Sequence, residues 1–254
     1  MGNIYESNNS MEKYVIALNG SVFIYFFLMT ADFALLGTYG ALIKPVEVIY
    51  WTIASNWIKF FLILLPWAGA LRQGIFRQMN LGLGALRHAS GGNWIKNLLQ
   101  TLMLGVVLLL AVDFISILNN LLLQFLQIKM PENLVVNLFK QGTPNIKYTM
   151  AFLALVTAPF CEEFFFRNIL FKFIRDVCCS QLNPKFSDRR RRTWIAALAT
   201  SLVFAVIHFN FYGVIPLFCL GLLFQFLFIR TKSLWPSIII HSLNNLQALL
   251  LTSL

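Results

Sequence analysis

Residues 148–171 read YTMAFLALVTAPFCEEFFFRNILF, and this stretch decides the class of fold. It is longer than the roughly 20 apolar residues that a helix needs to cross a bilayer. It nevertheless contains Glu162, Glu163 and Arg167. Ionisable side chains are costly inside hydrocarbon and usually mark a functional site there. The stretch therefore predicts a membrane-spanning helix that carries a candidate site.

The composition of the whole chain predicts the same class. Of its 254 residues, 58% are hydrophobic and 12% are charged, and the mean hydropathy is +0.71. Ordinary soluble domains are about 45–50% apolar and about 25% charged, so a soluble globule is excluded. Disorder is excluded too, because it needs low hydrophobicity. The net charge of +10 indicates basic cytoplasmic loops beside a lipid bilayer, and we expect no nucleic-acid partner.

Hydropathy predicts about seven transmembrane helices in one all-α polytopic membrane domain that covers residues 1–254. The expected spans are 14–38, 50–71, 97–118, 148–171, 194–210, 212–229 and 233–253. Residues 119–140 are apolar enough to leave an eighth span open. The polar residues of catalytic type fall in the last four spans, so we expect the catalytic bundle there.

Basic residues divide unequally between the two sides of this arrangement. Alternate loops, counted from the N-terminus, hold fourteen of them: Lys13, Arg72, Arg77, Arg87, Lys96, Lys172, Arg175, Lys185, Arg189 to Arg192, Arg230 and Lys232. The opposite loops hold four: Lys44, Lys129, Lys140 and Lys147. The positive-inside rule therefore places the N-terminus in the cytoplasm and the C-terminus outside.

Three features of the basic side have their own interpretations. The run Asp188 to Arg192 is best explained as a topological anchor, with binding of anionic lipids at the cytoplasmic face as the alternative. Residues 72–96 are expected to lie along the cytoplasmic interface. Cys178 and Cys179 are adjacent to the membrane and open to acylation, although inert thiols are the simpler interpretation.

The two glutamates of residues 148–171 have different surroundings. Glu163 and Arg167 are four residues apart, share a helix face and can neutralise each other. Glu162 points about 100° away around the helix and is left without a partner. A free carboxylate in such a position can act as a general base. Pro159 lacks an N–H and strains the preceding turn, as often happens beside functional sites in membranes.

Two histidines complete the candidate site. His208 follows Phe204 by one helical turn and shares a face with small residues, so it faces the bundle. His241 and Asn245 share a face of the last span and can present donors or acceptors to one small target. Any one of these residues alone could be structural glue between helices, but glue does not require general-base and electrophilic groups on neighbouring helices.

The remaining polar residues within spans have structural interpretations. Asp32, Lys59 and Asp113 lie in the outer half, where Lys59 could neutralise either acid. Cys161 could be weighed as a nucleophile with His208. It lies among phenylalanines, which favour an inert thiol.

These residues form three motifs that resemble the signature of the CPBP family, the CAAX-protease-like and bacteriocin-processing (Abi) intramembrane endopeptidases. The motifs are Glu162-Glu163-(x)3-Arg167, Phe204-(x)3-His208 and His241-(x)3-Asn245, in the family's order. The resemblance covers about residues 150 to 250. It implies a catalytic core over 148–254 and variable N-terminal helices over 1–147.

The resemblance implies a glutamate-dependent cleavage of a peptide or membrane-protein substrate without a cofactor. The implied catalytic roles are Glu162 as general base, His208 as the residue that holds the water, His241 with Asn245 as the oxyanion hole, and Glu163 with Arg167 and Phe204 as supporting residues. Short loops and a minimal N-terminus suggest a bacterial plasma membrane. Bacteriocin or pheromone maturation, or self-immunity, is then the expected context.

Three alternatives stay open at this point. Glu162, His208 and His241 could instead bind a catalytic zinc ion with an open position for water. The chain could be a non-catalytic immunity or partner-binding protein that retains the motifs. It could also be a transporter, although matched motifs in both halves, which transporters tend to show, are absent from the sequence.

Overall fold

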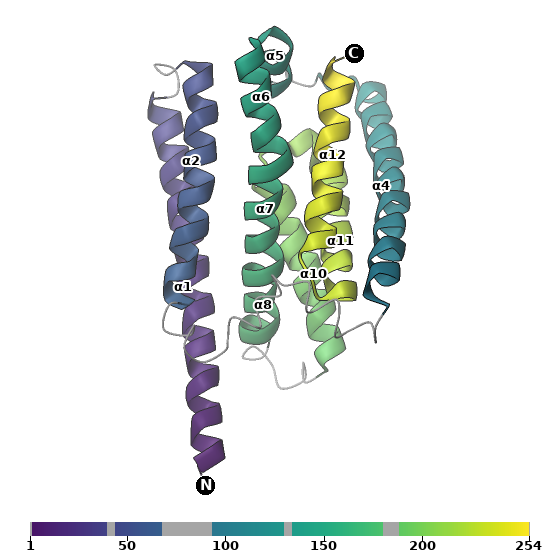
Figure 1. Ribbon diagram of the computed structural model, residues 1–254. Coiled ribbons are helices and arrows are strands. Elements are labelled where there is room, and N and C mark those ends of the chain that lie inside the picture. Colours follow the sequence, from purple (N-terminus) through teal and green to yellow (C-terminus); the bar gives the residue numbers. More distant parts are fainter. Residues whose placement is uncertain (1, 40–43, 68–92, 130–133, 180–187, 254) are drawn as a thin grey trace.

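The computed structural model describes residues 2–39, 44–67, 93–129, 134–179 and 188–253. Every element assigned within these ranges is helical, and the long helices stand side by side in an up-and-down bundle (Figure 1). The prediction of an all-α fold is confirmed for the described part of the chain. In this part, five helices are long and apolar enough to cross a membrane: Met11–Thr38, Val46–Trp67, Trp94–Phe125, Pro144–Cys178 and Phe211–Thr231.

The elements follow one another along the chain with short connections in the second half. They are α1 (Gly2–Tyr39), α2 (Pro45–Leu64), η1 (Leu65–Trp67), α4 (Trp94–Phe125), α5 (Leu134–Gln141), α6 (Pro144–Phe152), η4 (Leu153–Thr157), α7 (Ala158–Glu163), η5 (Phe164–Leu170), α8 (Phe171–Phe173), η6 (Ile174–Cys178), α10 (Arg189–Val206), η8 (Phe211–Gly213), α11 (Val214–Thr231) and α12 (Trp235–Ser253). The segments η4, η5 and η6 are π-helical. They join α6, α7 and α8 into one continuous rod.

Each of the seven predicted spans overlaps a helix, but α10 and α12 are not among the five helices that are long and apolar enough to cross a membrane. The helix α10 begins with four arginines, and α12 carries His241 and two asparagines. The helix α10 also ends at Val206, earlier than predicted, so His208 lies just beyond its C-terminal end in a turn where Phe209 has φ 50°. The lower end of α10 extends below that of α12 (Figure 1).

Within residues 119–140, the described part contains no helix of its own that is long enough to be an eighth span. The helix α4 continues only to Phe125, and Gln127 adopts a left-handed conformation with φ 54° that turns the chain away. The following helix, α5, has eight residues, too few to cross a bilayer. The segment 72–96, expected at the interface, lies outside the described residues as far as residue 92, and Trp94 begins α4.

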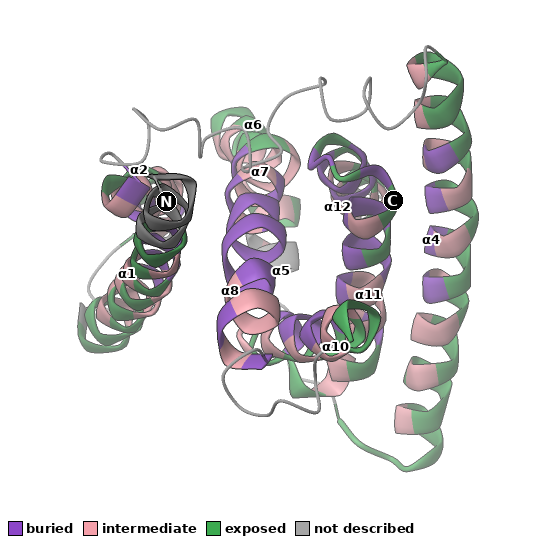
Figure 2. Ribbon diagram, turned by 90° about the horizontal axis from the view of Figure 1, so that it is seen from below, coloured by how far each residue is buried: buried purple, intermediate pink, exposed green. Residues whose placement is uncertain are grey.

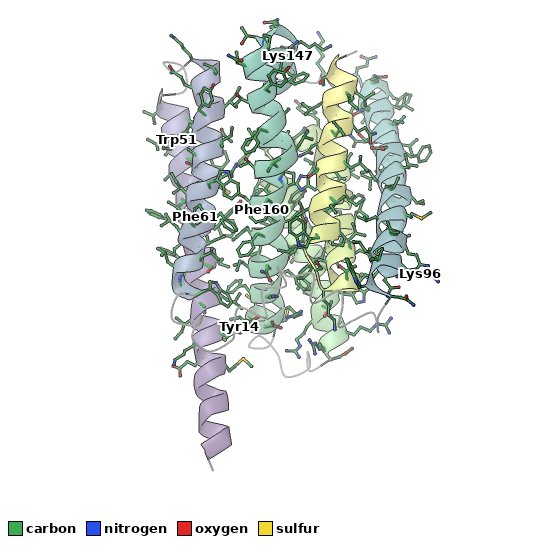
Figure 3. The ribbon with its side chains drawn as sticks, in the orientation of Figure 1. Tyr14, Trp51, Phe61, Lys96, Lys147 and Phe160 are labelled. Atoms are coloured by element: carbon green, nitrogen blue, oxygen red, sulfur yellow. The ribbon has the colours of Figure 1, made fainter. Side chains whose placement is uncertain are left out.

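The described members of the two sets of basic residues lie at opposite ends of the bundle. Figure 3 shows Lys96 near the lower end, where the chain also begins, and Lys147 at the upper end. The arginines that open α10 and the basic residues after α11 also lie at the lower end, because these helices run antiparallel to each other. The charge asymmetry predicted from sequence is thus a property of the folded bundle.

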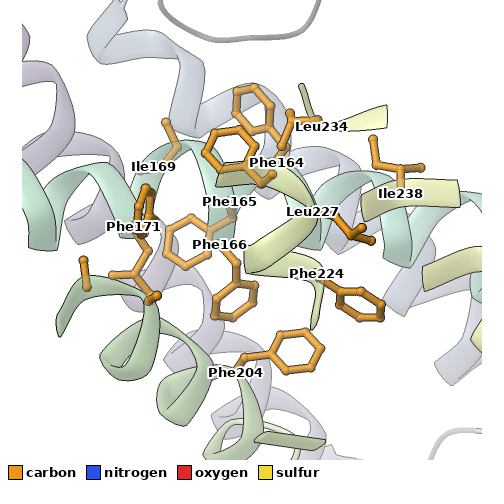
Figure 4. Close-up of a cluster of buried hydrophobic side chains, with 14 of the residues drawn as sticks. Phe164, Phe165, Phe166, Ile169, Phe171, Phe204, Phe224, Leu227, Leu234 and Ile238 are labelled. Carbon is orange, nitrogen blue, oxygen red and sulfur yellow. The ribbon is translucent and has the colours of Figure 1, made fainter. Parts of the chain in front are cut away.

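The best-packed part of the bundle surrounds the rod from α6 to η6. Phe164, Phe165 and Phe166 are fully buried (Figure 4). Phe204 of α10 packs on Phe166, and Phe224 of α11 packs on Phe204. In Figure 2 the buried residues gather on this rod and on the facing sides of α11 and α12, whereas α4 is buried along one stripe. Aromatic side chains bury large areas, so this cluster fixes the positions of the helices that carry the candidate site.

The helix α4 approaches the bundle closely through Gly105. A Cβ atom there would lie 2.8 Å from Cγ1 of Ile240 and 3.4 Å from Cδ1 of Leu227. Glycine thus lets α4 pack against α11 and α12 at backbone distance, a common device between membrane helices.

Candidate active site

Proline and π-helical geometry together free two backbone carbonyls at the start of the site. In η4 the N–H of Ala158 bonds to Leu153 O, five residues back, and so leaves Ala154 O without its usual donor. Leu155 O would accept from the N–H of residue 159, but Pro159 has none. Unsatisfied carbonyls are costly in a membrane, so both need donors from elsewhere.

Side chains of α12 supply these donors. Asn245 Nδ2 donates to Ala154 O at 2.8 Å, and Ser242 Oγ donates to Leu155 O at 2.8 Å. These two bonds attach α12 to the rod within one helical turn of His241. Asn245, expected only as an oxyanion donor, therefore uses one of its two amide hydrogens to join the helices, and its Oδ1 accepts from Asn244 at 3.2 Å.

Glu163 and Arg167 form the ion pair that their spacing predicts. Arg167 Nε lies 2.7 Å from Glu163 Oε2 and Nη2 lies 3.3 Å from Oε1, and neither side chain is exposed. His241 Nδ1 lies 3.0 Å from Glu163 Oε1. Because a carboxylate paired with arginine only accepts, Nδ1 of His241 carries the hydrogen. Glu163 thus links the rod to α12, a contact that sequence spacing alone could not reveal.

Glu162 and His208 face each other across a gap. His208 Nε2 lies 3.9 Å from Glu162 Oε2, beyond direct hydrogen-bond distance. That carboxylate oxygen is buried and has no hydrogen-bond partner within the described chain. As a whole, the Glu162 side chain is 22% exposed and the His208 side chain is 31% exposed. The prediction that Glu162 is the unpaired carboxylate of the pair agrees with this geometry.

The orientation of His208 is fixed by its own turn of the chain. Its Nδ1 lies 2.6 Å from the carbonyl oxygen of Phe204, and a carbonyl can only accept, so Nδ1 carries the hydrogen. In the neutral ring, Nε2 is then an acceptor that points toward Glu162. Both groups aim unshared electron pairs at the gap, where one water molecule could donate a hydrogen to each.

Aromatic rings hold the two imidazoles apart. Phe204 lies 4.6 Å from the His208 ring and 6.1 Å from the His241 ring, between centroids. Phe224 stacks on His241 at 4.7 Å with an interplanar angle of 16°. The Arg167 guanidinium lies over the faces of both phenylalanines at 5.3 and 5.7 Å. Phe204 is therefore a supporting residue for three polar groups at once.

The donors of the alternative zinc set are not assembled as one group. In the described residues, no three His, Cys, Asp or Glu side chains are placed to hold a metal ion together. His241 turns Nδ1 toward Glu163, while Glu162 and His208 face each other. The set Glu162, His208 and His241 therefore does not fit a three-ligand zinc site in this geometry.

The other charged groups within the spans have separate partners. Lys59 Nζ lies 2.7 Å from Asp32 Oδ2, and Ser55 also donates to this oxygen. Asp113 instead accepts from Gln247 at 2.9 Å. Lys59 thus neutralises Asp32, and these residues do not contribute to the candidate site.

Most of the residues singled out from sequence are brought together, and two contributors were missed. The residues joined by direct contacts are Glu163, Arg167, Phe204, His208 and His241, and Glu162 faces His208 at 3.9 Å. Ser242 and Phe224 were missed. For Ser242 a signal existed, since Pro159 leaves a carbonyl without a donor, but no pattern in the sequence says which helix supplies one. Phe224 is one of 25 phenylalanines, and nothing in its local sequence marks it.

A comparison with protein-family models gave a match within the second half of the chain. Residues 144–247 match the family model described as Rce1-like, type II CAAX prenyl endopeptidase Rce1-like. The match includes all three motifs and runs from the start of α6 into α12. Neither the search of curated proteins nor the search of solved structures gave a match.

Proposed function

Residues 144–247 belong to the CAAX-protease family to which the three motifs pointed, and from this premise we propose that the protein is an intramembrane glutamic endopeptidase. Glu162 is the proposed general base, and no cofactor is required. The observation that carries the proposal is the buried, unpartnered Oε2 of Glu162, 3.9 Å from the acceptor nitrogen of His208. At this spacing, one water molecule can donate a hydrogen to each of the two acceptors and is thereby held for reaction.

Glu163 is a poor candidate for the base, although it is adjacent. Its oxygens already accept from Arg167 and from His241, and the side chain is fully buried. A carboxylate whose lone pairs are engaged in this way is not available to accept a proton from a bound water molecule. We assign it the role of a positioning residue that fixes the orientation of the His241 ring.

The chemical step begins with the bound water. One hydrogen points to His208 Nε2 and the other to Glu162 Oε2, so a lone pair on the water oxygen is free to attack the scissile carbonyl carbon. The water proton passes to Glu162 as the new C–O bond forms, and the π electrons of the carbonyl move to its oxygen. When the C–N bond breaks, its electron pair stays on the amine nitrogen, which takes the proton from Glu162.

The oxyanion of the tetrahedral intermediate needs donors, and α12 can supply two. A His241 ring protonated on both nitrogens donates Nδ1–H to Glu163 and Nε2–H to the oxyanion. The second amide hydrogen of Asn245 is the other proposed donor, since the first is bonded to Ala154 O. Donors held in fixed positions stabilise developing charge most effectively.

The proposed substrate is a peptide or a membrane-associated protein. We place the protein in a bacterial plasma membrane with its N-terminus and its active site toward the cytoplasm, supported by the concentration of basic residues at one end of the bundle. Bacteriocin or pheromone maturation, or self-immunity, is the proposed context.

Cleavage of candidate peptides by the purified protein in liposomes tests the proposal. Glu162→Gln should lower the rate about 10²- to 10⁴-fold, the range for loss of a general base. Glu12→Gln removes an exposed carboxylate far from the site and serves as the matched control. Far-UV circular dichroism of each variant checks folding. Full activity of Glu162→Gln would contradict the assignment.

Further measurements separate the proposed mechanism from the metalloprotease, partner-binding and transporter alternatives. His208→Ala should reduce cleavage strongly, and activity should persist with a chelator present. Loss of activity with chelator and recovery on adding zinc would instead favour a metalloprotease. A biological phenotype that survives Glu162→Gln without any cleavage would favour a partner-binding protein, and ion or solute flux in the same liposomes would favour a transporter.

A further inference from the structure

A large groove lies at the basic-rich end of the bundle, away from the candidate catalytic residues. It has a volume of about 1760 Å³ and is bordered by α1, α8, α10, α11 and α4. The helices α10 and α4 pack on different sides of α11, so α11 forms part of its floor. None of Glu162, His208 and His241 lines it. The groove is thus a feature that the proposed reaction does not use.

The deep part of the groove is apolar and has the length of one bilayer leaflet. On α11 its lining runs from Cys219 to Ile229, about 15 Å of helix rise. Half of the roughly 30 Å hydrocarbon core is the same length. On the facing side, Leu104, Leu108 and Val112 of α4 complete the apolar wall. These dimensions suit acyl chains that lie parallel to the helices.

The rim of the groove is strongly cationic. Seven basic residues and one acid line it, and the acid, Asp176, is paired with Arg175 at 2.6 Å. Five of the cations have no ion pair with any acid in the described part of the chain: Arg189, Arg190, Arg192, Arg230 and Lys232. The Nε atom of Arg192 is buried and also lacks a hydrogen-bond partner among the described residues. This arrangement favours an anionic ligand.

Trp194 marks the level at which the two parts meet. It lines the groove one turn above Arg190 and is 55% exposed. Tryptophan prefers the boundary between hydrocarbon and headgroups in membrane proteins. The basic residues therefore lie at headgroup level and the apolar wall lies at acyl-chain level.

We propose that this groove binds one anionic phospholipid of the cytoplasmic leaflet. Its acyl chains lie along α4 and α11, and its headgroup phosphate contacts Arg190, Arg192 and Arg230. The phosphates of a nucleic acid would pair with the basic rim, but a nucleic acid has no apolar chain to pack against the apolar wall. A second copy of this chain, with a net charge of +10, would bring its own cations against this rim. An amphiphile with one anionic end satisfies both parts of the groove.

The proposal can be tested by quenching of tryptophan fluorescence with brominated lipids. The protein and its Trp194→Phe variant are reconstituted in neutral nanodiscs, and phosphatidylglycerol or phosphatidylcholine with brominated chains is added. The difference between the two proteins isolates Trp194. Half-quenching should require roughly tenfold less phosphatidylglycerol than phosphatidylcholine, because basic residues near the surface attract anionic lipids. Equal requirements for the two lipids would overturn the proposal.

Paired charge variants locate the site. Arg190→Gln with Arg192→Gln should weaken the phosphatidylglycerol effect about 10- to 25-fold, at most about fivefold for each cation lost. The matched control, Arg191→Gln with Lys96→Gln, removes the same charge at the same end but from residues that do not line the groove, and it should change little. Arg230→Gln is a second groove variant should the first pair fold poorly.

Two further results would contradict the proposal. Equal weakening by the control pair would assign the effect to net charge rather than to the groove. Displacement of phosphatidylglycerol by soluble glycerol phosphate or by a short RNA at comparable concentration would show a site for phosphate alone. Because no arm measures cleavage, these outcomes are independent of the proposed catalytic activity.

Discussion

Replacing Arg167 by methionine tests the central electrostatic feature of the site. The substitution keeps a long side chain of similar shape but removes the charge that pairs with Glu163. Both members of the pair are fully buried, and the pair makes contacts at 2.7 and 3.3 Å. Glu163 would then depend on His241, 3.0 Å away, as its remaining partner.

The expected cost follows from these contacts. Removing one partner of a buried ion pair destabilises a protein by about 3–5 kcal/mol, because the other charge is left unpaired away from water. The bond from His241 remains, so the lower part of this range applies. Arg167 also lies over the rings of Phe204 and Phe224, and losing such contacts adds about 0.5–1 kcal/mol. A total near 3–4 kcal/mol is expected.

Reversible unfolding in mixed micelles of a mild detergent and SDS, followed by circular dichroism, measures this cost. The double variant Glu163→Gln with Arg167→Met should be more stable than Arg167→Met alone, since no buried charge is left unpaired. Lys96→Met, which removes an exposed cation, should change stability by less than about 0.5 kcal/mol. A loss below about 1 kcal/mol for Arg167→Met, or a double variant less stable than the single one, would refute the reasoning.

Three other substitutions give distinct expectations. Gly221→Ala should destabilise the protein by about 1–3 kcal/mol in the same unfolding measurement. The new Cβ would lie 3.0 Å from Ser201 Cβ and 3.1 Å from Ser201 Cα. Unchanged stability would mean that α10 and α11 can move apart at no cost. Lys59→Met should be less stable than the double variant Lys59→Met with Asp32→Asn, and the opposite order would show that the pair is dispensable. Cys161→Ser should retain cleavage activity, and its loss would contradict a glutamate mechanism.

The helical membrane fold was predictable from sequence because its signals are local. A run of apolar residues specifies a spanning helix whatever surrounds it, and the loops between such runs carry the charge asymmetry. The pairing of Glu163 with Arg167 was equally predictable, since four residues along one helix fix their separation. The end of α10 before His208 was not, because a single left-handed residue, Phe209, ends the helical path.

Contacts between helices depended on the tertiary structure. No spacing in the sequence predicts that His241 bonds to Glu163, that Lys59 chooses Asp32 over Asp113, or that Ser242 satisfies the carbonyl that Pro159 leaves free. Such choices depend on which helix faces meet and at what depth, and many pairings satisfy the same rule that buried polar groups need partners.

The sequence by itself determined a polytopic helical membrane protein, the ion pair within one helix and three motifs that resemble those of the CPBP family. The tertiary structure decided that Glu162 faces His208 with an unpartnered oxygen, while Glu163 is held from two helices. It also placed an apolar groove beside the arginines of α10, which in the sequence looked like a topological anchor. The physical reason is that periodicity within a helix is set by backbone geometry, whereas the relation between helices is set by packing of faces distant in the chain.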